Sequence, residues 1–365
     1  MKIAIVGRGL IGSAAARHLA RAGHDVTLIG PDEPPRFEDH RGVFGSHYDE
    51  GRITRVNDRR PFFARVSHAS IARYAEIEAQ SGIPFFTASG SLVAGGPDYM
   101  EAVAKGREGL SFAFDDLSPD ALKSRFPCLA FPAGFSGVYE PKAGHISPRR
   151  LVAAQTEAAR RAGARIIAQE AVSVGDGRVR TADTSHSADR VIVAAGGWTD
   201  AVLGRAAVLE VYARTVAFHE IGPAEDERLR DMPSFVYDSP DSIYVLPPIR
   251  YPDGKVWLKL GGDPEDVLLP DQDAVGAWFR NGGSVEIGHH LTDTIRRLLP
   301  GLAFESRHIA PCVTTWTDTR VLEIRRLSPR LIVAAGGNGS GAKCSDELGR
   351  MAAALTTETA EETTP

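Results

Sequence analysis

Three glycines near the start of the chain have the spacing of a nucleotide-binding turn. Residues 7–12 read Gly-Arg-Gly-Leu-Ile-Gly, which is the pattern G-x-G-x-x-G. Between a strand and a helix, these glycines permit a tight turn, let backbone N–H groups approach a pyrophosphate, and allow close packing. The N-terminus of the helix then faces the anion. We expect dinucleotide contacts here, with a plain packing turn as the alternative; the residues concerned are Gly7, Gly9, Leu10, Ile11 and Gly12.

Four cationic side chains could bind or stabilise an anion. Arg52 and Arg55 lie three residues apart in a glycine-containing loop, and an arginine offers a fixed fork of donors that matches a carboxylate. Lys343 follows a glycine-rich turn at the start of a predicted helix, where backbone N–H groups can also meet a negative group. Strand alternation places Lys259 on the face opposite its two neighbouring leucines. Taken alone, all four are equally compatible with surface or edge positions.

The cysteines predict neither disulfides nor a metal site. There are three of them, Cys128, Cys312 and Cys344, and they are too few and too scattered for a disulfide framework or a zinc site. We therefore expect a reducing compartment and no metal. A free cysteine is most often a small buried hydrophobic residue, and this is the role predicted for Cys128 and Cys344.

The elements that must position these residues alternate between strands and helices. Apolar strands are predicted at 2–6, 25–29, 165–169, 190–195 and 331–335. Helices are predicted at 13–22, 62–80, 148–162 and 273–299, and from the last glycine cluster to residue 355. The strands that end at 6, 195 and 335 each run directly into glycines, as nucleotide-binding strands do.

A second group of strands has a different pattern. Segments at 85–95, 208–221, 234–238, 243–248 and 256–261 are strand-like, and Pro, Asp and Gly turns separate most of them. This spacing predicts an antiparallel sheet between the nucleotide-binding segments, which we interpret as a substrate domain.

Composition restricts the possible partners. The chain has 365 residues, 43% of them hydrophobic, which is enough for two to three domains with a sizeable core. Its formal net charge of -5 gives no indication of a basic face for nucleic acid or an anionic membrane. The sequence contains no apolar run long enough to span a membrane and no signal peptide, so we expect a cytoplasmic protein with a small-molecule partner.

Six segments together resemble the FAD-dependent amine oxidases of the D-amino acid oxidase superfamily, specifically the monomeric sarcosine oxidase and N-methyltryptophan oxidase branch. They occur in the family's order and extend over nearly the whole chain. The segments are residues 7–12, 45–55, 188–198, 257–261, 311–318 and 337–343.

The resemblance implies an α/β fold class, with a Rossmann-like FAD-binding domain of the glutathione-reductase type and an inserted substrate domain on a mixed or antiparallel β-sheet. The expected FAD-binding domain comprises residues 1–80, 140–205 and 305–356. Residues 81–139 and 206–304 would form the substrate domain, and the polar tail 357–365 is expected to be disordered.

The resemblance also implies roles for the cationic residues. Arg52 would lie over the flavin ring, while Arg55 and Lys343 would hold the carboxylate of the substrate. Lys259 would lie near the ring nitrogen and promote the reaction with oxygen, because a buried cation stabilises the negative charge that develops there.

Further roles follow from the same resemblance. Cys312 matches the cysteine that attaches to FAD through a thioether, with a small buried thiol as the alternative, and Tyr244 matches a tyrosine on the substrate side of the ring, with a core tyrosine as the alternative. The remaining implied cofactor contacts are Ser46, His47, Gly51, Val172, Ala195, Gly196, Trp198, Gly337, Gly339, Ser340 and Gly341.

The chain departs from the family pattern at several positions. Gly30 stands where an acidic residue would grip the adenosine ribose, and two acidic residues follow within three positions. In the substrate pocket, Asp263 and Tyr48 replace two histidines, and Thr314 replaces an aromatic residue. A secondary amine or amino acid other than sarcosine is therefore the expected substrate.

The sequence thus predicts a monomeric, oxygen-dependent amine oxidase that converts an N-methyl or cyclic amino acid to an imine and yields hydrogen peroxide. An FAD-dependent dehydrogenase with another electron acceptor and an FAD-binding protein without amine chemistry are the alternatives. A nicotinamide-only dehydrogenase would explain neither the third glycine cluster nor the segment around Cys312.

Overall fold

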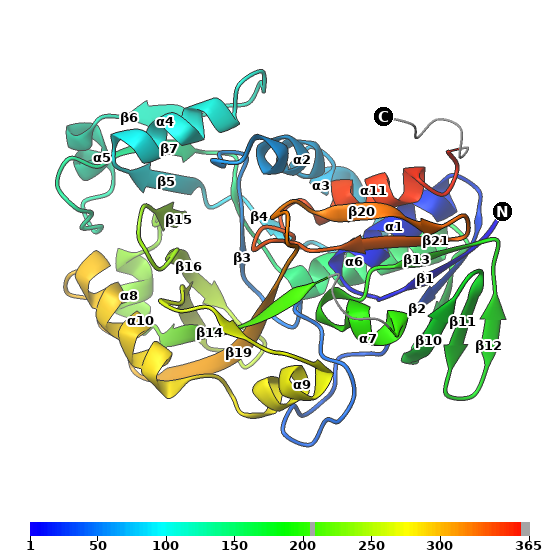
Figure 1. Cartoon of the computed structure of the whole chain (residues 1–365). Coiled ribbons are helices and arrows are strands. Elements are labelled where there is room, and N and C mark those ends of the chain that lie inside the picture. Colours follow the sequence, from blue (N-terminus) through cyan, green and yellow to red (C-terminus); the bar gives the residue numbers. More distant parts are fainter. Residues whose placement is uncertain (205–208, 359–365) are drawn as a thin grey trace.

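A computed structural model describes residues 1–204 and 209–358 and contains two large sheets (Figure 1). The first sheet has six strands in the order β20-β21-β13-β1-β2-β9, and all neighbours are parallel except β20 and β21. Its strands are β1 (Lys2–Val6), β2 (Asp25–Ile29), β9 (Arg165–Ile167), β13 (Arg190–Val193), β20 (Glu323–Ser328) and β21 (Leu331–Ala335).

Parallel pairing brings the glycine clusters to one edge of this sheet. β1 lies between β13 and β2, and β13 lies between β1 and β21, so the carboxyl ends of all four strands face the same side. The turns that follow them begin at Gly7, Gly30, Ala194 and Gly336. In parallel α/β sheets, ligands bind at this edge, where the strand order reverses.

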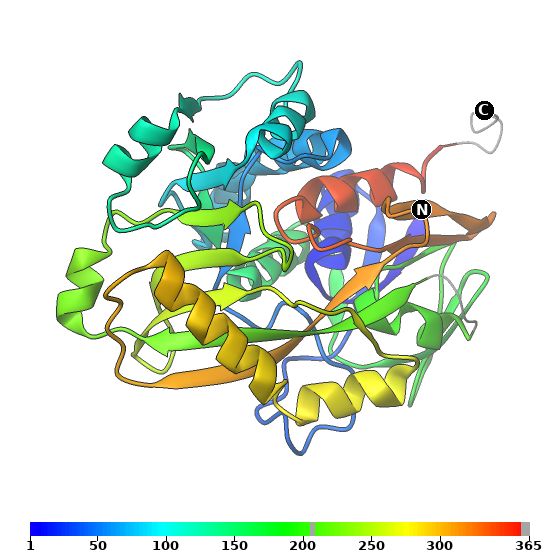
Figure 2. The same ribbon diagram turned by 60° about the vertical axis from the view of Figure 1, so that its left-hand side comes forward.

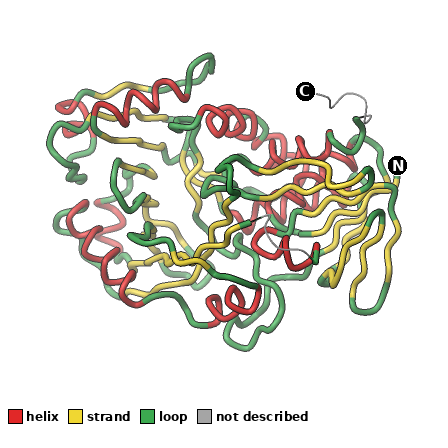
Figure 3. Tube along the Cα trace, viewed as in Figure 1, coloured by secondary structure: helices red, strands yellow, loops and turns green. Residues whose placement is uncertain are grey.

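Helices cover one face of the six-stranded sheet and a small sheet covers the other (Figure 3). α6 (Pro148–Arg161) and α11 (Ser345–Ala354) both pack against α1 (Leu10–Arg21) on the helical face. On the opposite face lie β10 (Ala171–Gly175), β11 (Arg178–Thr181), β12 (Ser185–Ser187), η1 (Gly196–Trp198) and α7 (Thr199–Leu203).

The second large sheet has nine strands and is antiparallel except where β15 pairs with β5, which confirms the predicted mixed sheet. Its order is β18-β14-β17-β16-β15-β5-β7-β6, with β19 also on β14. The strands are β5 (Ser91–Gly95), β6 (Asp115–Leu117), β7 (Ser136–Glu140), β14 (Glu210–Glu220), β15 (Ser234–Tyr237), β16 (Tyr244–Arg250), β17 (Val256–Gly261), β18 (Val267–Leu268) and β19 (Arg307–Trp316).

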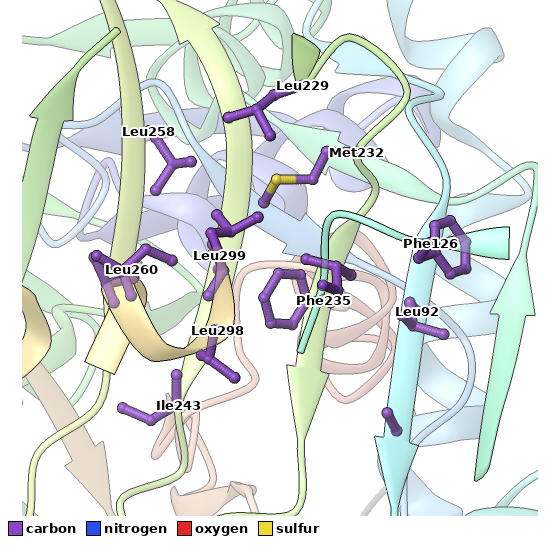
Figure 4. Close-up of a cluster of buried hydrophobic side chains, with 14 of the residues drawn as sticks. Leu92, Phe126, Leu229, Met232, Phe235, Ile243, Leu258, Leu260, Leu298 and Leu299 are labelled. Atoms are coloured by element: carbon purple, nitrogen blue, oxygen red, sulfur yellow. The ribbon is translucent and has the colours of Figure 1, made fainter. Parts of the chain in front are cut away.

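Helices close the nine-stranded sheet on one face, and Figure 2 shows α9 and α10 following one another across β14 and β19. α4 (Pro97–Gly106) packs on the opposite face, where Val103 contacts Val93 and Val138. The helices on the closed face are α5 (Pro119–Arg125), α8 (Pro223–Arg228), α9 (Gln272–Arg280) and α10 (Val285–Leu298). Leu258 and Leu260 of β17 point into the core beneath them, together with Phe235 and Leu298 (Figure 4). Their neighbour Lys259 therefore points to the opposite face.

A small sheet fixes the loop that carries the two arginines. β3 (Arg52–Thr54) and β4 (Phe86–Thr87) both pair with β8 (Gly144–Ile146). The loop-like stretch expected at 31–58 therefore contains a short strand. Behind it lie α2 (Pro61–Ile71) and α3 (Tyr74–Ser81).

The structure corrects several expected boundaries. The single helix expected at 62–80 is interrupted at Ala72–Arg73, where Arg73 binds two acidic residues of α11. The helix expected at 273–299 is interrupted between 281 and 284, because Gly282 and Gly283 adopt φ of 79° and 95°. Residue 208 of an expected strand and residues 359–365 of the expected tail lie outside the described residues.

The domain limits remain a proposal, and β19 bears directly on them. The segment 305–356 was assigned to the FAD-binding domain, but β19 pairs with β14 along its whole length, from Arg307 to Trp316. It therefore contributes to the nine-stranded sheet and then leads into β20 of the six-stranded sheet.

Candidate active site

A cavity of about 890 Å³ lies between the two large sheets. The glycine turn after β1 lines one part of it, and β14, β16 and the loop after β17 line another. Its volume is within the range of roughly 300 to 1,000 Å³ that is usual for small-molecule sites. The predicted glycine residues other than Gly12 and Gly51 line this cavity, together with Leu10, Ile11, Ala195, Trp198 and Ser340.

The turn after β1 has the geometry of a pyrophosphate cradle. Gly7 has φ of 106°, and a Cβ there would lie 2.2 Å from the carbonyl oxygen of Ala194. A Cβ at Gly12 would lie 1.9 Å from the carbonyl oxygen of Gly7, so both positions require glycine. Gly9 caps α1 without a side-chain hydrogen bond from the described residues, which leaves N–H groups of the first turn available to an anion.

The third glycine cluster is tied to β19. The backbone N–H of Asn338 donates to the carbonyl oxygen of Thr315 at 2.9 Å, and its side-chain oxygen accepts from the N–H of Thr317 at 3.1 Å. Asn338 is fully buried and has φ of 45°. These bonds hold the loop that leads to Lys343 against the strand that carries Cys312.

Arg52 and Cys312 meet at the cavity wall, although they are 260 residues apart in the chain. The Nη2 atom of Arg52 lies 3.6 Å from Sγ of Cys312 and 3.1 Å from the carbonyl oxygen of Ser46. Both side chains, and His47 beside them, line the cavity. Burial and three nearby arginines lower the pKa of His47 to about 3, so its imidazole is neutral.

Lys259 is buried on a central strand, which excludes the edge position left open by the sequence. β17 lies between β14 and β16, and the side chain of Lys259 is 0% exposed. Its ammonium forms an ion pair with Asp49 and donates to the carbonyl oxygen of Gly51 at 2.9 Å. It is not among the described residues that line the cavity.

Asp49 is a functional candidate that sequence reasoning missed. Its carboxylate accepts from Lys259, from Arg52, and from the hydroxyl of Tyr251 at 2.9 Å. Burial and Arg52 lower the pKa of Lys259, whereas contact with the Asp49 carboxylate stabilises the ammonium form. A buried lysine requires a counter-ion, but the burial of Lys259 and its contact with Asp49, 210 residues away, become visible only in the fold.

Arg55 and Lys343 lie beside the same internal carboxylate. Nζ of Lys343 is 2.6 Å from Oδ2 of Asp58, and Nη1 of Arg55 is 3.5 Å from the same oxygen. Burial would raise the pKa of Asp58, but Lys343, Arg55 and Arg60 outweigh it and hold the pKa below its usual range. Burial and Arg55 lower the pKa of Lys343 to about 8, against the effect of Asp58. Sequence reasoning missed Asp58.

Tyr244 and the three substituted positions are also part of the cavity wall. Tyr244, Tyr48, Asp263 and Thr314 all line it. Burial raises the pKa of Tyr244 above its usual range and that of Tyr48 to about 12, so both hydroxyls are protonated. The departures inferred from the sequence therefore change the cavity wall itself.

Gly30, at the position expected to bind the ribose, has no space for a side chain. A Cβ at Gly30 would lie 2.6 Å from the backbone nitrogen of Arg8, so the turn leaves no room for an acidic side chain there. Asp32 instead forms an ion pair with Arg8, which lines the cavity. Val172, one of the implied cofactor contacts, is 49% exposed and is not among the lining residues, whereas Glu170 and Ala171 are.

The part of the chain that the structure describes has neither a cluster suited to a metal ion nor a helix suited to a membrane. Within 1–204 and 209–358, no group of three or more His, Cys, Asp or Glu side chains could hold a metal ion. Within the same part of the chain, no helix is long and apolar enough to cross a membrane.

Known proteins resemble this chain over nearly its whole length. Monomeric sarcosine oxidase of Bacillus sp. (strain B-0618) is 26% identical over 368 residues, which cover 97% of this chain and 91% of that protein. N-methyl-L-tryptophan oxidase of Yersinia pestis (strain Pestoides F) is 26% identical over 360 residues, covering 96% and 93%. The solved structure of L-proline dehydrogenase from P. horikoshii superposes with a TM-score of 0.78 at 18% identity, covering 98% and 93%.

The shared fold and the cavity agree with a match to a family of flavoproteins. The described residues fit FAD, because the three glycine turns and the uncapped start of α1 converge on one cavity of sufficient size. The family model described as FAD dependent oxidoreductase (DAO) matches residues 2–355. The chain therefore belongs to the DAO family of FAD-dependent oxidoreductases.

Proposed function

We propose that the protein is an FAD-dependent oxidase of a secondary amine or amino acid, with an N-methyl or cyclic amino acid as the expected substrate and oxygen as the acceptor. One observation carries the proposal: a single cavity joins the glycine turns to Arg52, Cys312, Tyr244 and the pair of Arg55 and Lys343. The names of the two curated relatives, both oxidases, support this reading.

Separate groups of residues would hold FAD and orient the substrate. FAD supplies the capacity to accept a hydride from the carbon next to the amine. The turn after β1 and the start of α1 would hold its pyrophosphate, and Arg52 and Cys312 would lie at its ring, with Cys312 as the covalent attachment point. Arg55 would orient a substrate carboxylate, which replaces a loose encounter by a fixed one.

Lys259 would act from behind the cavity wall. Its ammonium is held by Asp49 and Gly51, and Asp49 in turn binds Arg52 at the cavity. A fixed positive charge in a site shielded from water stabilises negative charge as it develops on oxygen. We therefore assign Lys259 to the reaction with oxygen, and we assign Asp49 as the residue that positions the ammonium of Lys259.

An absorbance spectrum tests the proposal directly. The purified protein should be yellow, and its pellet should stay yellow after trichloroacetic acid if the flavin is attached through Cys312. Under anaerobic conditions, one of sarcosine, N-methyltryptophan, pipecolate, proline or D-amino acids should bleach the flavin absorbance. A colourless protein, or a yellow one that no amine bleaches, would contradict the proposed function.

A dehydrogenase that uses another electron acceptor is the second candidate, and one observation favours it. Lys259 is 0% exposed and is not among the described residues that line the cavity, so oxygen has no direct contact with it. The rate of oxygen consumption and the rate of reduction of an artificial dye, both measured with the same substrate, distinguish an oxidase from a dehydrogenase. An oxidase consumes oxygen at a rate comparable to its rate with the dye.

We also propose a cytoplasmic monomer. Three scattered cysteines without a disulfide suit a reducing compartment. One curated relative is named as monomeric. Sedimentation of the purified protein, whose chain mass is 39.2 kDa, tests the oligomeric state.

A further inference from the structure

Asp263 places a carboxylate in the cavity wall close to the predicted substrate side. It lies two residues beyond the end of β17, its side chain is 9% exposed, and it lines the same cavity as Tyr244 and Cys312. The backbone N–H of Thr215 donates to Oδ1 at 3.2 Å and fixes the carboxylate. Oδ2 has no hydrogen bond among the described residues, so it is available to a ligand.

The cations that face Asp263 are largely bound to other groups. From β14, Nε of Arg214 is 3.9 Å from Oδ2, which is too long for a hydrogen bond. Arg214 instead forms an ion pair with Asp266 and donates to the carbonyl oxygen of Ala213 at 2.8 Å. From α10, His290 is held by Asp241 at 2.8 Å. Among the described residues, the counter-ion of Asp263 is therefore Arg214, which is shared with Asp266 and does not hydrogen-bond to Asp263.

This environment makes the carboxylate a better proton acceptor than an exposed one. Burial raises the pKa of Asp263 to about 6, and Asp266 adds to the rise, while the N–H of Thr215, Arg214 and His290 oppose it. Tyr244, the group that faces it from β16, stays protonated because burial raises its pKa. The carboxylate of Asp263 is thus ionised near neutral pH, yet its pKa is closer to that of an amine than the pKa of a normal aspartate is.

The proposed reaction needs such an acceptor. Near neutral pH an amino acid carries its amine as an ammonium, which has no lone pair on nitrogen. A hydride leaves the neighbouring carbon only as that lone pair forms the C=N bond. The ammonium must therefore lose one proton inside the cavity before, or as, the oxidation begins.

We propose that Asp263 receives this proton and is a catalytic residue of the oxidation; the inference rests on the proposed function. One N–H bond of the ammonium breaks, and its electron pair remains on nitrogen. The proton forms an O–H bond with Oδ2 of Asp263, so the step needs no oxidant or reductant. A zwitterionic substrate would then have its ammonium at Asp263 and its carboxylate at Arg55, both of which line the cavity.

Asp263→Asn tests the proposal by anaerobic stopped-flow reduction with the amine that bleaches the wild-type protein. Near neutral pH the limiting rate of reduction, and not only the Kd, should fall by about 100-fold, the lower end of the usual effect of a general base. The ratio of the wild-type rate to the variant rate should fall toward 1 at a pH above the pKa of the free amine, because the substrate then arrives deprotonated. Asp263→His should recover part of the rate.

A second readout does not depend on turnover. The infrared band of a protonated carboxyl group should appear in the wild-type protein as the pH falls through about 6 and should be missing in Asp263→Asn. Asp293→Asn, an exposed replacement on α10, is the matched control and should change neither readout.

The outcomes separate the inference from the function on which it rests. A loss of rate in Asp263→Asn that is independent of pH, or a loss confined to the Kd, would overturn the proton-transfer role and leave the oxidase intact. A wild-type protein that no amine bleaches would overturn both. Retained flavin absorbance in Asp263→Asn shows that the variant is folded, so a lost rate is not a lost protein.

Discussion

Lys259 shows how a single residue depends on its surroundings. A lysine at 0% exposure is costly unless its charge is compensated, and Asp49 together with the carbonyl oxygen of Gly51 provides that compensation. The residue is therefore a fixed cation behind the cavity wall, not a mobile ligand. Its contribution should be electrostatic and specific to the step in which negative charge develops.

Replacing Lys259 by methionine tests this at the residue scale. We expect reoxidation of the reduced protein by oxygen to slow by about 10²- to 10³-fold, the usual cost of losing one electrostatic donor in a buried site. Anaerobic reduction by substrate should change much less. Lys255→Met, which removes an exposed cation just before the same strand, is the control. Equal slowing of both half-reactions in Lys259→Met would remove the assigned role.

Arg55 carries the recognition of the substrate carboxylate more than Lys343 does. The ammonium of Lys343 is 2.6 Å from Asp58 and its side chain is 5% exposed, whereas Arg55 is 3.5 Å from Asp58 and is 15% exposed. Arg55→Ala should therefore weaken the binding of carboxylate-bearing amines by about 1.5 to 3 kcal/mol, the value of a charge-assisted hydrogen bond. The KM of the matching amides is the control. An equal effect on acids and amides would contradict the pairing.

The candidate site could be predicted from the sequence only in part. Arg52, Cys312, Arg55 and Lys343 were predicted through the family resemblance. The structure brings Arg52 to Cys312 and places Arg55 and Lys343 beside the same carboxylate. Asp49 and Asp58 were missed because an aspartate in a loop has no local pattern that marks it as a counter-ion. Their partners lie 210 and 285 residues away, so only the fold reveals the pairs.

At the scale of elements, the packing of α1 against α11 decides where the anion-binding end of α1 points. Gly349 of α11 sits at this contact, where an added Cβ would lie 2.5 Å from Cβ of Ala14 and 2.6 Å from the backbone nitrogen of Ala15. Such distances to backbone atoms force the helices apart. The close approach of the two helices therefore depends on this glycine.

Gly349→Ala should lower the free energy of unfolding by about 1 to 3 kcal/mol, because overpacking outweighs the gain in helix propensity. Urea unfolding measures the change. Gly175→Ala is the control, since a Cβ there meets no atom of the described residues within 4 Å. A more stable Gly349→Ala protein would mean that the helices shift apart at little cost.

Asp346 of α11 joins α1, α6 and the junction between α2 and α3 at one buried point. Its carboxylate accepts from Arg17 of α1 at 2.8 Å, from Gln155 of α6 at 2.9 Å, and from Arg73, between α2 and α3, at 2.5 Å. Burial would raise its pKa, but the hydrogen bond of His18 and the charges of His18, Arg17 and Arg73 outweigh it and hold the pKa below its usual range. The ionised Asp346 therefore stabilises the folded protein at pH values above the pKa of an aspartate in the unfolded chain, about 3.9. This stabilisation is lost as the pH falls below that value.

Asp346→Asn should consequently destabilise the protein by about 3 to 5 kcal/mol near neutral pH, because it leaves buried cations without their partner. The difference from wild type should narrow as the pH falls below about 4. Thermal unfolding over a series of pH values measures it. A difference that stays constant down to low pH would show that Asp346 acts through packing and not through its charge.

Elements with a strong local pattern were predicted well, and those that depend on distant partners were not. β1, α1 and β2 follow from an apolar run, a glycine turn and helical spacing within 30 residues. β19 contains a proline and mostly half-buried residues, and its partner β14 lies almost 100 residues earlier. β10 and β12 are largely exposed and lack a clear alternation of buried and exposed residues, and β11, which does alternate, is only four residues long.

For the whole molecule, the sequence predicted two kinds of sheet but not how they meet. The glycine turns place the nucleotide edge of the parallel sheet, because the carboxyl ends of its strands must converge. The cavity also needs Val93, Val216, Val236 and Tyr244 of the nine-stranded sheet, which no local motif ties to the first sheet. The union of the two sheets depends on side-chain packing between them, which a sequence pattern does not record.

A ligand in this cavity contacts both large sheets, so its binding should stabilise the whole molecule. The test needs a protein from which the flavin can be removed, and Cys312→Ser should provide it. Acid precipitation should leave the flavin in the pellet of the wild type and in the supernatant of Cys312→Ser. Cys128→Ser, at a half-buried site packed against the core of the nine-stranded sheet, is the control and should keep a yellow pellet.

Returning FAD to the flavin-free Cys312→Ser protein should raise its Tm. At a free FAD concentration 100 times the Kd, binding to the folded state alone adds about 2.7 kcal/mol of stability. Because the cavity wall is built from both sheets, the whole protein should unfold in one transition, and FAD should shift that transition to a higher temperature. A shift confined to the unfolding of the part that contains β1 is not expected. Release of flavin from the wild type by acid would refute the thioether, and an unchanged Tm would refute this cavity as the FAD site.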